Sequence, residues 1–221
     1  MVGNLLQNVL IRKKLFGIED LSEIIIMTPI RDIYEKVLSR YKLIERLTNG
    51  WWNHKRIQLK EKKISFVKIP QGHAVLDTLN CFDTAKKVIL LGFCGGNSDF
   101  LEIGDVICPN DASSREGVVK RNFNFNFVGV KLGKLMHVNT FCEQNEFFLN
   151  LVKTNKISCV DMETFFLYSE CLRKNIECCS LLITTDLLAT RPFYLTDQND
   201  FKKVHNAYRT FEEAVSYVVK N

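Results

Sequence analysis

The chain has 221 residues, a length that suits one domain, and its 46% hydrophobic residues can fill a sizeable core. The net charge of +5 is spread along the sequence, so it favours anionic ligands without indicating nucleic-acid binding. No apolar run reaches membrane-spanning length, and the N-terminus lacks a signal-peptide layout. Eight cysteines without a Cys-x-x-Cys pair indicate reduced core residues of a cytoplasmic protein rather than disulfides or a zinc site.

The hydrophobic pattern alternates between the periods of strands and helices, which is typical of an α/β fold. In chain order, we expect a helix over residues 3–20, a strand over 23–26, a helix over 32–47, a hairpin over 51–63, a strand over 64–69, a helix over 74–82, strands over 87–91, 123–128, 134–138 and 157–160, a helix over 162–174, a strand over 178–185 and a helix over 202–220.

Two carboxylates stand at comparable ends of a strand–helix–strand unit over residues 157–186. Glu163 follows the short first strand, and Asp186 follows the nearly apolar second strand. The carboxyl ends of strands face the ligand crevice in open α/β sheets. A charge at the end of a buried strand must be solvated, paired or used, so a solvated Glu163 and a capping Asp186 are the alternative.

A glycine-rich segment follows the expected strand over residues 87–91. It reads Gly92-Phe93-Cys94-Gly95-Gly96, and an Ile-Gly-Asp-Val segment follows at residues 103–106. Glycines at a strand end let the backbone approach a ligand closely and leave N–H groups free for anions. We therefore expect a ligand-facing turn at residues 92–96.

Together these motifs resemble the nucleoside phosphorylase/nucleosidase superfamily, which includes purine and uridine phosphorylases and methylthioadenosine/S-adenosylhomocysteine nucleosidase. The matching stretches are residues 92–96, 103–106, 160–163 and 185–186, in the family's order and at similar distances. The resemblance covers the chain from about Ile24 onward. It implies a three-layer α/β/α sandwich with a mixed, partly barrel-like central sheet, as a single domain over residues 1–221.

The resemblance also implies roles for individual residues. Asp186 would protonate the leaving base, and Glu163 would bind the ribose hydroxyls while Met162 packs on the sugar. Phe141 and Cys142 would contact the base, although Phe141 fits an ordinary core position equally well.

The phosphate or nucleophile side of the implied site comprises Arg31, Gly92, Phe93, Cys94 and Gly95. Arg31 stands where phosphorylases carry an arginine that binds phosphate, just after the first strand. A guanidinium at a helix N-terminus is unfavourable unless an anion lies there. An exposed surface arginine is the alternative.

Two further residues lie in loops that the family uses near its pocket. Arg191 follows Asp186 and is expected either to contact an anion or to pair with Asp186, which would lower the pKa of that carboxyl. For His73, a capping or surface role is favoured over contact with a ligand.

Several positions depart from the family pattern. The usual serine of the glycine-rich turn is Phe93, and a second phosphate-binding arginine is replaced by Leu90. The glutamate that activates water in the nucleosidase aligns near Arg31, and the arginine before its catalytic acid is replaced by Leu182. The residues that the resemblance implies for the leaving group are thus present, whereas those for the nucleophile differ from the family pattern.

The resemblance implies an enzyme that hydrolyses the N-glycosidic bond of a purine-type nucleoside or nucleotide, without a metal or organic cofactor. The alternatives are a purine nucleoside phosphorylase, with phosphate as co-substrate, and a catalytically impaired nucleoside-binding protein. The expected partners are the small-molecule substrate and further copies of the chain, because relatives are dimers, trimers or hexamers. Neither nucleic acid nor a membrane is an expected partner.

Overall fold

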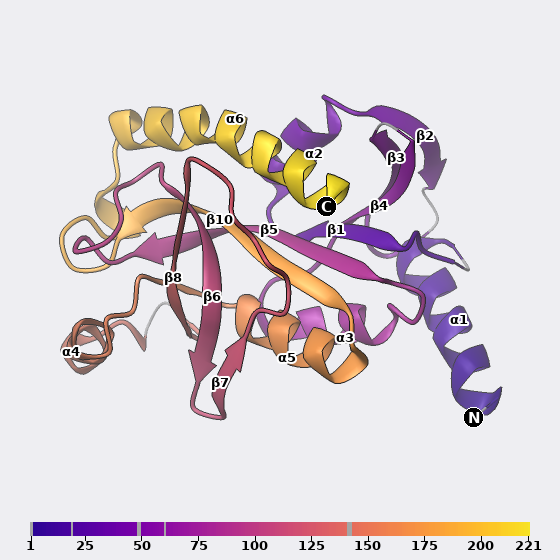
Figure 1. The fold of residues 1–221 in the computed structure, drawn as a ribbon, viewed down its shortest axis with the longest axis horizontal. Coiled ribbons are helices and arrows are strands. Elements are labelled where there is room, and N and C mark those ends of the chain that lie inside the picture. The colour runs from indigo at the N-terminus through magenta and orange to yellow at the C-terminus, as the bar shows by residue number, and fades with distance from the viewer. Residues whose placement is uncertain (1, 19, 48–49, 60, 141–142) are drawn as a thin grey trace.

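A ten-stranded mixed sheet with helices on both faces forms the protein (Figure 1). The computed structural model describes residues 2–18, 20–47, 50–59, 61–140 and 143–221. The helices are α1 (Val2–Phe16), α2 (Arg31–Leu38), α3 (Val75–Asn80), α4 (Glu146–Thr154), α5 (Thr164–Lys174) and α6 (Gln198–Lys220), with 3₁₀ turns η1 (Gly72–Ala74) and η3 (Phe193–Leu195). The strands are β1 (Ile24–Thr28), β2 (Lys42–Leu47), β3 (His54–Leu59), β4 (Lys62–Lys68), β5 (Lys87–Gly96), β6 (Val106–Ser114), β7 (Gly117–Lys120), β8 (Val130–His137), β9 (Cys159–Asp161) and β10 (Glu177–Leu187).

Five strands close into a barrel, because β10 pairs with both β6 and β5. The order around the barrel is β10, β6, β8, β9 and β5. The pairings β5–β10, β6–β8 and β8–β9 are parallel, whereas β6–β10 and β5–β9 are antiparallel. Beyond β5 the sheet continues through β1, β4, β3 and β2, and β7 pairs with β6.

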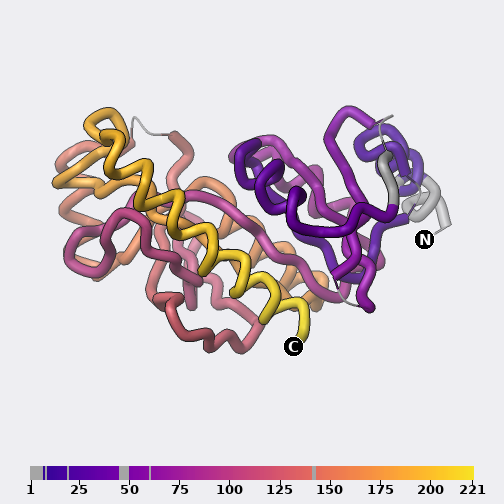
Figure 2. Tube along the Cα trace, turned by 90° about the horizontal axis from the view of Figure 1, so that it is seen from above, coloured from indigo at the N-terminus to yellow at the C-terminus, as the bar shows by residue number. Residues whose placement is uncertain are grey.

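The sheet separates two large layers of the hydrophobic core, one on each face, and a smaller third cluster packs around α4. Helices α2 and α6 cover one face, where Val37 and Phe211 are fully buried with Ile89 of β5. Helices α3 and α5 cover the other face, and Figure 1 shows the two pairs of helices on opposite sides. Viewed from above, α6 crosses the molecule obliquely, and the N-terminal elements gather at one end (Figure 2). This arrangement confirms the predicted three-layer sandwich with a partly barrel-like sheet.

The parallel strands β4, β1, β5 and β10 end at a common edge of the sheet. Thr28 of β1 is level with Lys68 of β4, and Asp186 of β10 is level with Gly95 of β5. Strands β5 and β10 extend past β1, since Met27 is already level with Leu90. This edge carries Asp186 and the backbone of residues 92–95, for which a function is predicted.

Three expected elements differ from the structure. The helix expected over residues 32–47 ends at Leu38, because residues 42–47 pair with β3 as strand β2. The turn expected at residues 92–96 is wrong, because β10 pairs with β5 as far as Gly96 and keeps this segment extended. Residues 123–128 form no regular strand, although Phe123 and Phe125 are buried as predicted.

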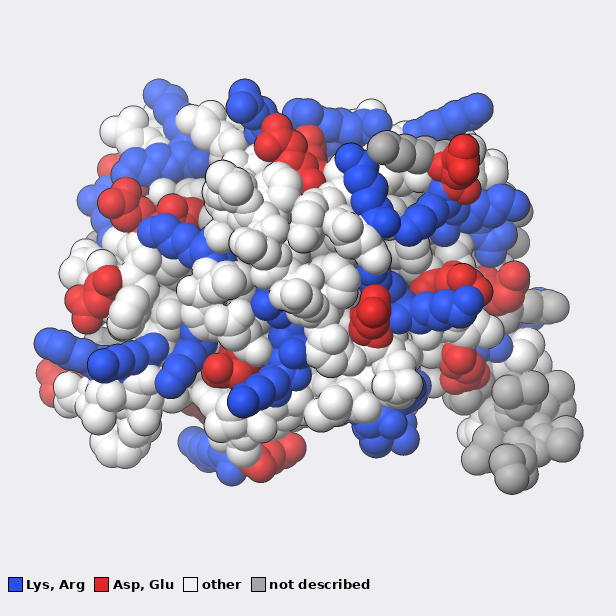
Figure 3. Space-filling model, viewed as in Figure 1, with Lys and Arg blue, Asp and Glu red and all other residues white. Residues whose placement is uncertain are grey.

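The seven described cysteines are all free and buried, in agreement with reduced core residues. Basic and acidic side chains are interspersed on the face shown in Figure 3. Within the described part of the chain, no helix combines the length and the hydropathy needed to cross a membrane.

Gly104 is expected to tolerate no side chain, because it combines a left-handed backbone with close packing. Its φ is +94°, and a Cβ would lie 3.0 Å from the carbonyl oxygen of Lys203 in α6. We expect Gly104→Ala to destabilise the fold by about 1–3 kcal/mol, and each kcal/mol lowers the melting temperature by about 2–4 °C. Gly117→Ala is the control for backbone strain alone, since Gly117 has a φ of +138° but no atom within 4 Å of a Cβ. Equal losses in the two variants would contradict the packing argument.

Candidate functional site

Asp186 lies near the carboxyl end of β10 and is almost completely buried, with 7% of its surface exposed. The hydroxyl of Thr185 donates a hydrogen bond to Oδ1 of Asp186 at 2.9 Å, and the backbone N–H of Phe193 donates another to the carboxyl group. Burial raises the pKa of Asp186, and these two hydrogen bonds offset the shift only in part. Asp186 is therefore a carboxyl group that holds a proton more readily than an exposed aspartate.

Gly95 brings Asp186 against strand β9. A Cβ on Gly95 would lie 3.4 Å from Oδ2 of Asp186 and 3.3 Å from the side chain of Val160. Because glycine leaves this space open, the carboxyl group and β9 approach the same point of β5. Val160 directly precedes the segment that ends at Glu163, so two of the predicted motifs meet at Gly95.

Glu163 lies between β9 and α5, and it is 7% exposed. The backbone N–H of Gly72 donates a hydrogen bond to Oε1 of Glu163 at 2.6 Å. Burial raises the pKa of Glu163, against the opposing effect of backbone N–H groups at Gly72 and Met162. The methyl group of Met162 would lie 3.7 Å from a Cβ on Gly72. The turn at Gly72 therefore holds both residues that were predicted to bind the ribose.

Asp161 is a buried acid beside this pair that the sequence reasoning did not assign to the site. It accepts hydrogen bonds from the backbone N–H and the hydroxyl of Thr164. Burial, followed by the nearby charge of Glu163, raises the pKa of Asp161 to about 8. A signal was available, because Asp161 ends a buried strand and Asp186 lies one residue before the end of another.

The raised pKa of Asp161 predicts a pH-dependent stability. Between its ordinary pKa of 3.8 and its folded value of about 8, the folded protein holds a proton that the unfolded chain has lost. Stability therefore falls as the pH rises through this window, by at most about 1.4 kcal/mol per pH unit. We expect thermal unfolding from pH 5 to pH 8 to show a falling melting temperature, and Asp161→Asn to flatten that slope. An equally steep slope in the variant would contradict this assignment.

Aromatic side chains form a wall next to the Gly72 turn. The ring of His73 lies 4.3 Å from that of Phe166 of α5, and the ring of His137 lies 4.7 Å from the same phenylalanine. Burial lowers the pKa of His137, which favours a neutral imidazole. His73 itself is exposed. Flat rings of this kind can stack with a planar base. His137 was not predicted from the sequence. The predicted base-binding residues, Phe141 and Cys142, lie outside the described residues.

The residues predicted for the nucleophile side lie on strand β5 rather than in a turn. Phe93 is half-buried and packs toward the core layer of α2 and α6. Cys94 belongs to the opposite layer, and its Sγ lies 3.7 Å from the hydroxyl of Thr184. Since Phe93 and Cys94 point to opposite faces of the sheet, only the backbone between Gly92 and Gly95 offers a continuous surface to one ligand.

Two arginines are paired with acids other than Asp186. Arg31, the first residue of α2, pairs with Glu35 at 2.7 Å, and its side chain is 77% exposed. Arg191 pairs with Asp197 and Asp200 at the start of α6, so the expected ion pair with Asp186 is wrong. The physical reason is the capping box of α6, which gathers two carboxylates next to Arg191.

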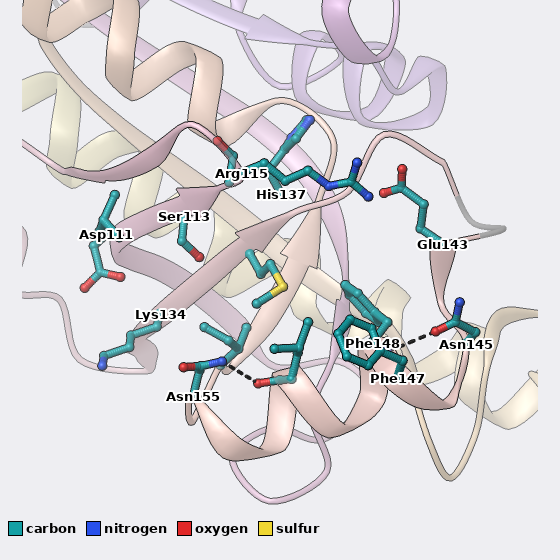
Figure 4. Close-up of a pocket in the computed structure, with 15 residues that line it drawn as sticks. Asp111, Ser113, Arg115, Lys134, His137, Glu143, Asn145, Phe147, Phe148 and Asn155 are labelled. Carbon is teal, nitrogen blue, oxygen red and sulfur yellow. Dashed lines mark hydrogen bonds between the residues drawn. The ribbon is translucent and has the colours of Figure 1, made fainter.

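A cavity of about 570 Å³ opens between strands β6–β8 and helix α4 (Figure 4). Figure 4 shows the guanidinium group of Arg115 directed toward the carboxylate of Glu143 on one side, with Phe147 and Phe148 on the helix side. His137 belongs both to this cavity and to the aromatic wall. The cavity is therefore next to the Glu163 end of the candidate site.

No family model matches the chain. The DeoD-type purine nucleoside phosphorylase of Buchnera aphidicola subsp. Acyrthosiphon pisum (strain 5A) is 23% identical over 212 residues, covering 82% of this chain and 89% of the relative.

Solved structures of nucleosidases and nucleoside phosphorylases have a similar fold. A mutant 5′-methylthioadenosine/S-adenosylhomocysteine nucleosidase of Helicobacter pylori, with 5′-methylthioadenosine in its active site, has a TM-score of 0.76 at 16% identity, covering 89% of this chain and 99% of the other. Uridine phosphorylase from Vibrio fischeri has a TM-score of 0.74 at 15% identity, covering 91% and 93%. The chain therefore has the fold of the nucleoside phosphorylase/nucleosidase superfamily, which confirms the resemblance that its motifs predicted.

Proposed function

We propose that the protein hydrolyses the N-glycosidic bond of a purine-type nucleoside or nucleotide, with Asp186 as the acid. The observation that carries this proposal is the position of Asp186. Its carboxyl group is buried, meets β9 at Gly95, and has a pKa raised by burial. The names of the similar proteins support cleavage of a nucleoside, because they are nucleosidases and nucleoside phosphorylases.

Cleavage of this bond leaves positive charge on the sugar and negative charge on the base. Asp186 donates its proton to the departing base, a step that contributes about two to four orders of magnitude in rate. Glu163 holds the ribose hydroxyls through charge-assisted hydrogen bonds, and Met162 packs against the sugar. Water adds its hydroxide to the anomeric carbon, and its remaining proton restores Asp186. The proposed reaction requires no metal or organic cofactor.

The residues around Asp186 form the remaining parts of the proposed site. The backbone between Gly92 and Gly95 lines the nucleophile side, on which the side chains of Phe93 and Cys94 diverge. Phe141 and Cys142, which lie outside the described residues, are proposed to contact the base. Strands β5, β9 and β10 meet at Gly95, where Asp186 and Val160 are both level with this glycine.

Phosphorolysis is the second candidate function, because a purine nucleoside phosphorylase and a uridine phosphorylase are among the similar proteins. In that reaction phosphate replaces water as the nucleophile. A nucleoside-binding protein without turnover is the third candidate, since Phe93 stands where the resemblance implies a serine.

A panel of nucleosides and nucleotides, assayed for free base with and without phosphate, separates these functions. Base release without phosphate supports hydrolysis, and release that requires phosphate supports phosphorolysis. Binding by calorimetry without base release supports the third candidate. Neither binding nor release across purine nucleosides and nucleotides would overturn the proposal.

We also propose that the protein works in the cytoplasm as a homo-oligomer. The free buried cysteines suit a reducing compartment. Large apolar side chains are exposed on α4 and in the loop after β10, including Phe147 at 73% and Tyr194 at 71%. Exposed apolar groups of this size favour contact with a further protein surface. Light scattering after size-exclusion chromatography tests this, and a monomeric mass would refute it.

A further inference from the structure

A basic cavity of about 550 Å³ lies between α2 and the hairpin of β3 and β4. Its charged lining residues are Arg31, Glu35, Lys55 and Lys68, and the amide side chain of Asn53 also lines it. Three cations thus face a single carboxylate. Arg31, which was expected on the phosphate side of the implied site, lines this cavity, whereas Asp186 and Glu163 do not.

The strand register places both lysines on the same face of the sheet. Lys55 of β3 is paired with Phe66 of β4, and Lys68 lies two residues after Phe66 along the same strand. Side chains alternate along a strand, so Lys55, Phe66 and Lys68 share a face. The ring of Tyr34 of α2 lies 4.9 Å from that of Phe66, which identifies this face as the one that α2 covers. The lysines therefore lie on the face of the sheet that α2 covers, and they line the cavity from the sheet side.

The two lysines have no carboxylate partner among the described residues. Glu35 is paired with Arg31 at 2.7 Å, which leaves Lys55 and Lys68 without an acidic neighbour at hydrogen-bond distance. The Nζ of Lys55 lies 6.0 Å from the centre of the Tyr34 ring. The buried hydroxyl of Tyr34, which also lines the cavity, has no hydrogen-bond partner in the described part of the chain. Like charges that share a cavity repel each other, and a bound anion reverses this effect.

We propose that this cavity binds a phosphate group through Lys55 and Lys68, with Asn53 as a further donor. Ammonium groups form charge-assisted hydrogen bonds with phosphate oxygens, and a doubly charged phosphate matches two free cations better than a carboxylate does. The proposal concerns binding alone, so it stands whether or not the proposed N-glycosidase activity is correct.

The position of the cavity indicates two sources for the phosphate group. Lys68 ends β4 at the same sheet edge as Phe93 and Asp186, and β1 alone separates β4 from β5. Two strand spacings correspond to about 10 Å across the sheet, which is within the length of a nucleotide. The phosphate group is therefore either carried by the substrate itself or is inorganic phosphate.

Calorimetric titration with inorganic phosphate tests the site directly. We expect the wild-type protein to bind phosphate and Lys55→Gln/Lys68→Gln to bind it at least about tenfold more weakly. Lys120→Gln/Lys202→Gln removes the same charge from exposed positions outside the cavity and is expected to bind phosphate as the wild type does. Lys55→Arg/Lys68→Arg keeps the charge and is expected to retain binding. Melting temperatures of all variants report whether each one is folded.

The source of the phosphate group follows from titrations with a purine nucleoside and its 5′-monophosphate. If the monophosphate binds more tightly than the nucleoside, and the double glutamine variant loses this advantage, the substrate carries the phosphate. If phosphate binds but the two purine ligands bind equally, the site takes inorganic phosphate. Absence of phosphate binding at millimolar concentration, unchanged binding in the folded double glutamine variant, or an equal loss in the Lys120 and Lys202 control would overturn the inference.

Discussion

Asp186→Asn is expected to lower the rate of base release by about two to four orders of magnitude while leaving nucleoside binding nearly unchanged. Asparagine has the shape of aspartate but cannot deliver an acidic proton to the leaving base. Its carbonyl oxygen can still accept the hydrogen bond from the hydroxyl of Thr185, so this contact of the side chain is kept. Single-turnover rates and calorimetric affinities measure the two quantities separately.

The pH dependence gives a second measurement of the same assignment. Burial raises the pKa of Asp186, so its acidic form persists to a higher pH than that of an exposed aspartate. We expect wild-type base release to fall as the pH rises through this raised pKa, because the proton donor is lost. The residual activity of Asp186→Asn is expected to lack this limb.

Asp99→Asn is the matched control for the acid assignment. Asp99 is exposed in the loop after β5, and the substitution removes one carboxylate from the same edge of the sheet. Its rate is expected to equal that of the wild type. Full activity in Asp186→Asn, or an equal loss in Asp99→Asn, would show that another group supplies the proton.

The position of Asp186 at the sheet edge and that of Glu163 at the start of α5 could be predicted from the sequence, because they depend on local patterns. A buried strand that ends in a carboxylate marks the edge at Asp186, and the helical period after Glu163 marks the start of α5. Parallel pairing of β10 with β5 then brings Asp186 level with Gly95. The common direction of β5 and β10 is enough to place Asp186, but β9 runs antiparallel to β5, so the expectation that Glu163 and Asp186 follow comparable strand ends is wrong.

Features that depend on long-range pairing were not predictable in the same way. Residues 92–96 have the composition of a turn, yet pairing with β10 keeps them in strand β5. Residues 42–47 continue a helical pattern, yet they pair with β3. In both segments the tertiary partner decides the conformation, and local propensity does not reveal that partner.

Residues 123–128 show a third kind of difference. The alternation of phenylalanine and asparagine predicted a strand, and Phe123 and Phe125 are indeed buried. The side chain of Asn122 accepts a hydrogen bond from the backbone N–H of Cys178 and donates one to the backbone carbonyl of Ile176. At the start of β10, a side chain therefore makes the hydrogen bonds that a neighbouring strand would make with its backbone. The alternating pattern reported which side chains are buried but not the backbone pairing.

Glu163→Gln is expected to lower kcat/KM by about 10- to 100-fold without destabilising the fold. The amide oxygen of glutamine can still accept the hydrogen bond from the N–H of Gly72, so the turn that holds Met162 remains in place. The charge is lost, and hydrogen bonds from the ribose hydroxyls to a neutral acceptor are weaker by about 1–2 kcal/mol each. Removal of a buried charge also favours folding, and it removes one cause of the raised pKa of Asp161.

A substrate that lacks ribose hydroxyls distinguishes direct contact from a structural effect. If Glu163 binds these hydroxyls, the penalty of Glu163→Gln on a ribonucleoside should largely disappear on the corresponding 2′,3′-dideoxynucleoside, because the missing hydroxyls leave nothing for the charge to bind. Glu213→Gln, at an exposed position of α6, is expected to match the wild type on both substrates. A penalty of equal size on the two nucleosides would mean that Glu163 acts through the Gly72 turn or through Asp161, and that the sugar is held by other groups.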